Sequence, residues 1–212
     1  IFRKMIKILV TGGNGQLAQC LKDVVKNDDE LDVNFLDLPD LDITNQQQLA
    51  SCFSNHKFDY CINCAAYTAV DLAEEQSDLA YAVNAEGPKK LAEVCKKHQV
   101  KLLHISTDFV FDGQKRTPYL ETDPPKPLSV YGASKLQGEY HIQEIMDDYF
   151  IVRTSWLYSE YGNNFMKTML RLSETRDEIS VVSDQIGAPT YAGDLAEVLI
   201  KIVLSSSTNY GV

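Results

Sequence analysis

The stretch that decides the fold is Ile6-Lys-Ile-Leu-Val-Thr-Gly-Gly-Asn-Gly-Gln-Leu-Ala18. A short β-branched run meets a glycine-rich turn, and apolar residues at helical spacing follow through Val25. Strand, glycine turn and helix in this order are typical of a dinucleotide-binding site. Gly12 is expected to allow the tight turn, and Gly15 to let a pyrophosphate approach the backbone at the helix N-terminus. A plain strand-to-helix turn is the alternative interpretation.

Strands continue to alternate with helices along the chain, which predicts an α/β fold of the Rossmann type with a doubly wound parallel sheet. We expect an NAD(P)-binding domain over residues 1–155. Residues 156–212 are expected to form part of a small C-terminal substrate-binding region, interleaved with the last sheet elements. Further strands are predicted at 32–37, 60–63, 101–106, 150–154 and 180–182. Helices are predicted at 45–55, 71–84, 88–98 and 192–204. One more helix should open at Pro127 or Ser129 and carry Tyr131 and Lys135, and another should follow the cap Asn163-Asn164-Phe165.

Tyr131 and Lys135 lie one helical turn apart and therefore share a helix face. A lysine ammonium beside a phenol should lower the pKa of the phenol, which suits proton transfer to a carbonyl oxygen. The pair alone is common by chance, and a solvated helix face is the alternative. Thr107 adds a hydroxyl at the carboxyl end of a predicted strand, where Rossmann-type sheets place their chemistry.

Other strand ends carry further candidate groups. Asp37 ends the second strand about twenty residues beyond the glycines, where a carboxylate can accept from ribose hydroxyls and favours NADH over NADPH. The small residues Ala65 and Ala66 leave room for a ligand after the third strand. Trp156 could equally be a core residue or stack on a ligand. His104 lies inside an apolar run, which favours a core histidine over a base.

The net charge of −10 argues against nucleic acid and against an anionic membrane surface as partners. No apolar run approaches the roughly 20 residues that span a bilayer, and residues 1–5 show no signal-peptide core. We therefore expect a cytoplasmic protein, with residues 1–4 left from an upstream start. The five cysteines do not suggest a disulfide framework. Cys61 and Cys64 are interpreted as buried strand residues, and no metal site is predicted.

Seven motifs in order resemble the dTDP-4-dehydrorhamnose reductases, which are extended short-chain dehydrogenases/reductases. The resemblance runs from about residue 5 to the end of the chain. Its motifs are Thr11-Gly-Gly-Asn-Gly-Gln-Leu17, Asn63-Cys-Ala-Ala-Tyr-Thr-Ala-Val-Asp71, Ser106-Thr-Asp-Phe-Val-Phe-Asp-Gly113, Tyr131-Gly-Ala-Ser-Lys135, Arg153-Thr-Ser-Trp156, Gly162-Asn-Asn-Phe165 and Asp184-Gln-Ile-Gly-Ala-Pro-Thr190.

The resemblance implies reduction of the 4-keto group of dTDP-4-dehydro-L-rhamnose by NADPH or NADH. It makes Tyr131 the proton donor, Lys135 the residue that lowers the pKa of Tyr131 and binds the nicotinamide ribose, and Thr107 the hydroxyl that orients the substrate. Further residues match family contacts with the cofactor, namely Gly15, Gln16, Leu17, Asp42, Ile43, Ala66, Tyr67 and Thr68. Thr107, Asp108 and Trp156 match family contacts with the dTDP-sugar.

The resemblance also permits a homodimer and a magnesium ion, although it places no magnesium ligands in this chain. Position 67 is tyrosine where relatives often have histidine, and Ala18 replaces a common third glycine. Family members continue beyond Val212, so we expect the substrate-binding region to be truncated.

Two alternatives stay open. The first is a nucleotide-sugar epimerase or dehydratase on the same scaffold, although Thr107-Asp108-Phe109 lacks the acid pair that a dehydratase needs. The second is a non-catalytic regulator like the beta subunit of methionine adenosyltransferase.

Overall fold

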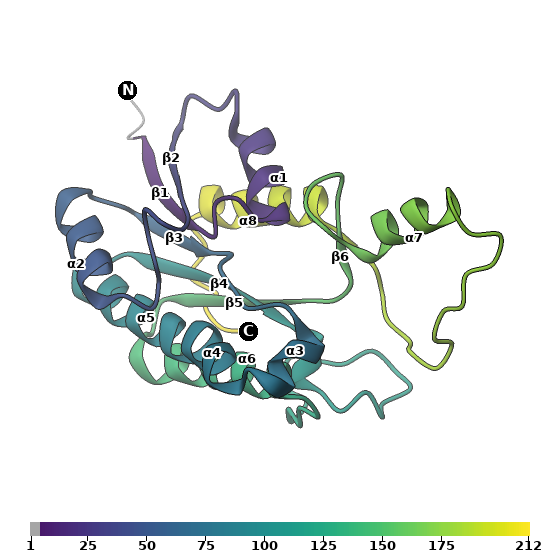
Figure 1. The fold of residues 1–212 in the computed structure, drawn as a ribbon. Helices are drawn as coiled ribbons and strands as arrows, with labels where there is room; N and C mark the ends of the chain where they lie inside the picture. The colour runs from purple at the N-terminus through teal and green to yellow at the C-terminus, as the bar shows by residue number, and fades with distance from the viewer. Residues whose placement is uncertain (1–4) are drawn as a thin grey trace.

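Five parallel strands form the central sheet of the computed structural model, which describes residues 5–212 (Figure 1). The strand order is β2-β1-β3-β4-β5, so the chain reverses direction across the sheet between β1 and β3. Such a switch point leaves a crevice at the carboxyl ends of the two strands, where ligands bind in open α/β sheets. The strands are β1 (Ile6–Thr11), β2 (Leu31–Leu36), β3 (Tyr60–Asn63), β4 (Lys101–Thr107) and β5 (Tyr149–Thr154).

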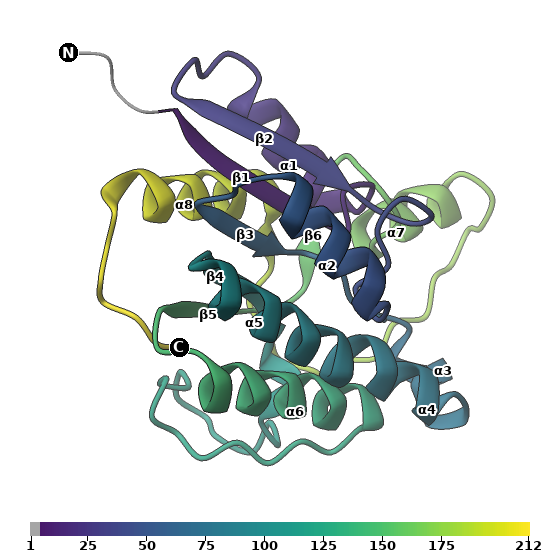
Figure 2. The same cartoon turned by 90° about the vertical axis from the view of Figure 1, so that its left-hand side faces the viewer.

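Helices cover both faces of this sheet (Figure 2). One face carries α1 (Gln16–Val25) and α8 (Ala192–Ser205). The other carries α2 (Gln46–Asn55), α5 (Gly87–His98) and α6 (Val130–Ile145). The predicted doubly wound Rossmann-type fold is therefore confirmed.

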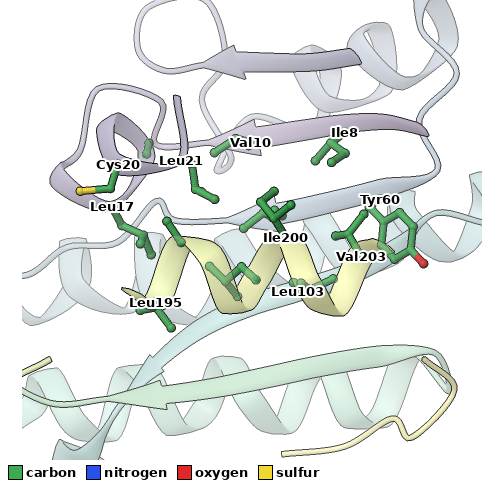
Figure 3. Packing of buried hydrophobic residues seen from close by; sticks show 14 of the residues in the cluster. Ile8, Val10, Leu17, Cys20, Leu21, Tyr60, Leu103, Leu195, Ile200 and Val203 are labelled. Atoms are coloured by element: carbon green, nitrogen blue, oxygen red, sulfur yellow. The ribbon is translucent and has the colours of Figure 1, made fainter. Parts of the chain in front are cut away.

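Alternating side chains of the strands divide the core into two apolar layers. Ile8 and Val10 of β1 face α1 and α8, where Leu195, Ile200 and Val203 pack against them (Figure 3). Leu9, between them in sequence, points to the opposite face. Because side chains alternate along a strand, nearly every residue of β1 is apolar, as in other sheets buried on both faces.

Side-chain caps fix the start of three helices as the sequence predicts. Asn45 accepts hydrogen bonds from the backbone N–H groups of Gln47 and Gln48 at the start of α2. Ser129 caps α6 in the same way, and Asn164 caps α7 (Phe165–Ser173). An N-cap satisfies N–H groups that have no partner inside the helix.

The helix predicted over residues 71–84 is wrong in detail. The chain instead forms two short helices and a π-helix that runs on into α5: α3 (Val70–Glu75), α4 (Ser77–Tyr81) and η1 (Ala82–Glu86). Pro88 does not interrupt the helix, because proline is tolerated in the first turn, where its missing N–H has no partner to lose.

The strand predicted at 180–182 is also wrong, since these residues form no regular structure and the side chains of Val181 and Val182 are exposed. A second, two-stranded sheet pairs β6 (Leu157–Tyr158) with β7 (Thr190–Tyr191). Between these strands, α7 and the loop after it extend away from the main sheet (Figure 1), and α7 contains no buried residue. Residues 1–4, predicted to come from an upstream start, lie outside the described residues.

Candidate active site

The predicted site residues follow the carboxyl ends of the five strands, so the topology brings them to one edge of the sheet. Gly12 follows β1, Asp37 follows β2 and Ala65 lies just beyond β3. Thr107 ends β4, and Trp156 lies two residues beyond β5. This edge is where an open α/β sheet binds its ligand.

The glycine turn is tightly packed throughout, and a Cβ atom on Gly15 would lie 3.2 Å from the carbonyl oxygen of Gly12. Gly12 has φ +66°, and a Cβ atom there would lie 2.6 Å from the backbone nitrogen of Ala65. α1 begins directly after Gly15 without a side-chain cap. The first N–H groups of α1 can therefore hold an anion, and the turn fits a dinucleotide pyrophosphate.

Gln16 and Leu17 can take part in such binding only through their backbone. The Gln16 amide nitrogen donates to the carbonyl oxygen of Leu157 at 3.3 Å, which connects the start of α1 to β6. The side chain of Leu17 is buried in the core.

The acidic residues after β2 are held by backbone groups. Both carboxylate oxygens of Asp37 accept backbone hydrogen bonds at 2.8 Å, one from the N–H of Asn14 and one from the N–H of Leu38. Asp42 accepts from the N–H and hydroxyl of Thr44 in a local turn. Ile43 is buried, and its side chain packs on Gly87. The cofactor contacts assigned to Asp42 and Ile43 stay predictions.

Residues 65–68 are fixed by a side chain that sequence reasoning missed. Asn84, in the π-helix η1, accepts from the N–H of Tyr67 at 2.8 Å and donates to its carbonyl oxygen at 3.0 Å. The same amide group donates to the hydroxyl of Ser134 on α6 at 3.1 Å. Asn84 thus ties the segment containing Ala66 and Thr68 to the helix that carries Tyr131 and Lys135.

Tyr131, Thr107 and Asp108 form one cluster at the end of β4. The Thr107 hydroxyl donates to Asp108 at 3.2 Å and accepts from the N–H of Phe109 in the short helix η2 (Asp108–Val110). Burial raises the pKa of Tyr131, the charge of Asp108 adds to this, and a hydrogen bond with Thr107 opposes it. Burial also raises the pKa of Asp108. Tyr131 is therefore protonated at neutral pH and can act as an acid.

Lys135 is not among the groups that shift the pKa of Tyr131 in this structure, and the effect expected from their spacing stays a prediction. The lysine side chain is only 2% exposed, and its Nζ donates to the carbonyl oxygen of Ile105 at 2.6 Å. The amine is thus directed into the sheet. Burial lowers the pKa of Lys135 to about 8, although the charge of Glu139 opposes that effect.

A buried ion pair anchors α6 next to this cluster and was also missed from the sequence. Arg153 of β5 donates to both carboxylate oxygens of Glu139, at 3.0 and 2.6 Å, and Glu139 is fully buried. The hydroxyl of Ser106 donates to the same carboxylate. The two charges pair with each other, which is the condition for burying them, although the remaining guanidinium nitrogen of Arg153, Nη1, is buried without a hydrogen-bond partner. Arg153 lies three residues after the start of a predicted strand, and its sequence gave no sign of its partner because that partner is on another element.

Trp156 has a strained backbone, with φ +46°, and the residue is 44% exposed. The ring packs on Gly187, where a Cβ atom would lie 2.7 Å from an indole carbon. Strain of this kind in a non-glycine residue is most often kept at functional sites. A substrate contact of Trp156 stays a prediction.

No group of three or more metal-binding side chains lies within residues 5–212, so nothing in this part of the chain supports a magnesium site. All five cysteines are free, and Cys61 is buried in β3 as expected, whereas Cys64 lies just beyond the strand and is only partly buried, so the expectation for Cys64 is wrong. None of the helices that the structure describes has the length and apolarity needed to cross a membrane.

Three features together define an extended short-chain dehydrogenase/reductase: a parallel Rossmann-type sheet, a tightly packed glycine turn before α1, and a tyrosine four residues before a lysine, near a threonine that ends a strand. Residues 6–212 match the family described as RmlD substrate binding domain. The chain is 46% identical to the dTDP-4-dehydrorhamnose reductase of Aggregatibacter actinomycetemcomitans, and the match covers 98% of this chain and 72% of that relative. The protein belongs to the dTDP-4-dehydrorhamnose reductase family.

Two solved structures agree with this assignment. The dTDP-4-dehydrorhamnose reductase from Clostridium acetobutylicum superposes with a TM-score of 0.93 at 47% identity. The enzyme from Bacillus anthracis, in complex with NADP, gives a TM-score of 0.93 at 46% identity. Each match covers 97% of this chain and 72% of the relative.

Proposed function

We propose that the protein reduces the 4-keto group of dTDP-4-dehydro-L-rhamnose with a nicotinamide cofactor and releases dTDP-L-rhamnose. One arrangement carries this proposal: the tyrosine Tyr131 on α6 interacts with Thr107 and Asp108 at the carboxyl end of β4, and burial raises the pKa of its phenol. Membership of the reductase family supports it independently.

Each residue of the cluster has a role that its geometry supports. Tyr131 gives its proton to the carbonyl oxygen, which becomes the new hydroxyl group. Thr107 and Asp108 orient that oxygen beside the phenol. When bound, the cofactor supplies the hydride to the carbonyl carbon. The remote thymidine diphosphate provides binding energy that positions the ketone.

We propose NADP(H) as the first cofactor to test. The relative from Bacillus anthracis was solved with NADP, which bears against the NADH preference inferred from Asp37. Both carboxylate oxygens of Asp37 already accept backbone hydrogen bonds in this structure, so ribose hydroxyls would have to compete for them. The glycine turn and residues 65–68 would hold the rest of the cofactor.

The substrate's nucleotide would bind outside the main sheet. We assign this role to Trp156, β6 and α7, in keeping with the predicted substrate-binding region after residue 155. Of these elements, α7 exposes large apolar side chains, among them Phe165 and Leu170, as a surface that covers a ligand or another segment would.

The test is oxidation of NADPH and of NADH by the full-length protein with dTDP-4-dehydro-L-rhamnose made in situ. Tyr131→Phe should lower the rate by about 10² to 10⁴-fold, because the acid is lost, while cofactor binding is unchanged. Tyr140→Phe is the matched control, since Tyr140 is an exposed tyrosine on the same helix.

Three results would contradict the proposal. The wild-type protein could bind cofactor yet turn over neither NADPH nor NADH, as a regulator would. It could carry tightly bound NAD through purification and interconvert sugars without net oxidation, as an epimerase would. Full activity of Tyr131→Phe would show that Tyr131 is not the proton donor.

A further inference from the structure

The side chain of Gln16 contacts a part of the chain that is far away in sequence. This part, residues 157–164, contains β6 and the cap of α7, and we call it the β6–α7 segment. The amide nitrogen of Gln16 donates to the carbonyl oxygen of Leu157 at 3.3 Å. Its Oε1 lies 3.4 Å from both the hydroxyl of Ser159 and the amide nitrogen of Asn164. One amide at the start of α1 thus contacts both ends and the middle of the β6–α7 segment.

Backbone groups fix the direction in which the Gln16 amide points. The carbonyl oxygen of Leu157 can only accept, so the amide nitrogen of Gln16 faces it. On the other side, Oδ1 of Asn164 accepts from the N–H of Lys167 at 3.0 Å and caps α7. The amide nitrogen of Asn164 is therefore the group that faces Oε1 of Gln16, as a donor. Donors and acceptors match on both sides, so the contact favours one arrangement of the β6–α7 segment.

The surroundings of the Gln16 amide are buried and closely packed. Ser159 is only 1% exposed, and its hydroxyl oxygen accepts from the N–H of Tyr161 at 3.1 Å. Gly162 has φ +61°, and a Cβ atom there would lie 3.3 Å from the Cβ atom of Gln16. Hydrogen bonds in such a place are costly to lose, because water cannot take the place of the missing partner.

The β6–α7 segment depends on a small number of contacts with the rest of the chain. β6 belongs to the separate two-stranded sheet, and α7 buries none of its side chains (Figure 1). Leu157 and Tyr161 are only partly buried against the apolar layer that includes α1. The Tyr161 hydroxyl also donates to the carboxylate of Asp23 on α1 at 2.6 Å, at the surface. Segments held by few buried contacts are those that a bound ligand orders most readily.

The backbone of Gln16 takes part in the proposed cofactor site. Gln16 is the first residue of α1, whose N–H groups have no side-chain cap and fit the cofactor pyrophosphate. At the other end of the contact, Leu157 directly follows Trp156, a residue of the proposed nucleotide site. A pyrophosphate held by the backbone of Gln16 therefore fixes the residue whose side chain holds the β6–α7 segment.

We propose that Gln16 is a positioning residue that couples the two ligands of the enzyme: cofactor bound at the start of α1 orders the β6–α7 segment through the Gln16 amide, and the substrate nucleotide then binds more tightly. The substrate side of this coupling rests on the proposed function, which assigns the nucleotide to Trp156, β6 and α7. Coupling between two binding sites is reciprocal, so the nucleotide must strengthen cofactor binding by the same factor.

Amide hydrogen exchange tests the cofactor side without substrate. In the full-length protein, saturating NADP⁺ should slow exchange in the β6–α7 segment by about 5-fold or more. Gln16→Met keeps the backbone N–H, the side-chain length and the helix propensity but removes both hydrogen-bonding groups, so saturating NADP⁺ should no longer slow that exchange. Gln19→Met is the matched control. Its amide lies one turn further along α1 and donates to the carbonyl oxygen of Gly13, so the protection of the segment should remain.

Titration calorimetry tests the substrate side, with dTDP as the probe. In the wild-type protein, saturating NADP⁺ should lower the Kd for dTDP by about 5-fold or more, and in Gln16→Met by less than about twofold. Steady-state kinetics at saturating NADPH should agree, since Gln16→Met should raise the KM for dTDP-4-dehydro-L-rhamnose by about 5-fold and change kcat by a smaller factor. A purely structural role would instead weaken the binding of each ligand alone and lower kcat, which would contradict the proposal.

A second variant keeps the test available if Gln16→Met does not fold. Asn164→Asp still caps α7, because its carboxylate accepts from the N–H of Lys167, but it cannot donate to Gln16 and should also weaken the protection. Unchanged protection in either folded variant, or no protection by NADP⁺ in the wild-type protein, would overturn the proposal. If the wild-type protein did not bind dTDP while protection by NADP⁺ still depended on Gln16, the proposed function would fail alone and the cofactor side of the coupling would be supported.

Discussion

At the scale of single residues, the buried amine of Lys135 is the feature with the clearest energetic consequence. Its side chain is 2% exposed, and its closest partners are a carbonyl oxygen and the imidazole of the buried His104, which its lowered pKa keeps neutral. Neither partner carries a negative charge that would offset the loss of hydration. A buried lysine under these conditions releases its proton more easily than it does in water.

This burial predicts that stability rises with pH over a defined window. The pKa of Lys135 is about 8 in the folded protein, against 10.5 for an unperturbed lysine. Between these values the unfolded chain binds a proton that the native chain has released, so raising the pH favours the native state. Relative to Lys135→Met, the wild-type protein should gain about 3 kcal/mol in the free energy of unfolding across this window.

Urea unfolding of both proteins at a series of pH values between about 7.5 and 10.5 measures this gain. Because other groups titrate equally in the two proteins, the difference isolates Lys135. Lys97→Met, at an exposed position on α5, serves as the control for removing an amine from the surface. A difference between wild type and Lys135→Met that stays flat over the window would show that the amine is not buried in solution as it is here.

At the scale of elements, the approach of α6 to η2 sets the position of the proposed acid. A Cβ atom on Gly132 would lie 2.2 Å from the carbonyl oxygen of Phe109, which is backbone and cannot turn aside. The ring of Phe109 meets that of Tyr131 edge-on, with centroids 5.5 Å apart. Glycine at position 132 is what allows the helix carrying Tyr131 to lie so close to Thr107.

We therefore predict that Gly132→Ala lowers both the stability and the activity of the protein. The added methyl group should destabilise the protein by about 1 to 3 kcal/mol through overpacking, despite the better helix propensity of alanine. A displacement of Tyr131 by about 1 Å should lower kcat/KM by about 10²-fold.

Thermal unfolding and steady-state kinetics on the same preparation give both numbers. Tyr140→Ala, on an exposed face of α6, provides the control for a change in the helix that leaves its approach to η2 intact. Wild-type activity in Gly132→Ala would mean that α6 can move without displacing the acid.

Local patterns in the sequence predicted most of these elements but not the contacts between them. The glycine turn, the caps at Asn45 and Ser129 and the five sheet strands each leave a local signature, and all appear in the structure. The valines at 181 and 182 have strand propensity but no neighbouring strand or core to pack against, so they remain outside the sheets.

Residues that act across elements leave no such signature. Asn63 and His104 lie far apart in sequence and meet only because β3 and β4 pair in one register. Asn84 lies in the π-helix η1, and the spacing of apolar residues in the sequence does not predict a π-helix. The direction of the Lys135 side chain depends on these partners, which is why the expected effect of Lys135 on Tyr131 could not be judged from their spacing alone.

At the scale of the whole molecule, the chain after residue 155 divides into elements that lie apart from the main sheet and one helix that packs on it. β6, β7 and α7 form a separate small layer, and α7 buries none of its side chains. α8, which follows them, returns to the main sandwich and packs against α1 and the sheet (Figures 1 and 3). The boundary predicted between residues 155 and 156 therefore does not separate two independent cores, because buried side chains of α8 belong to the same apolar layer as those of α1 and β1.

This arrangement predicts that the chain unfolds in one step that includes α8. Leu199 of α8 is fully buried in the layer shared with α1 and β1, so Leu199→Ala should lower the free energy of unfolding by about 2 to 5 kcal/mol. Val198→Ala, at a neighbouring position that is 47% exposed, should cost much less. Circular dichroism and intrinsic tryptophan fluorescence should give one coincident transition in each protein, since Trp156 lies outside the main sheet and reports on β6 and β7. If Leu199→Ala instead unfolded α8 in an early, separate transition while the remaining helical signal persisted, α8 would not be part of the same cooperative core as the sheet.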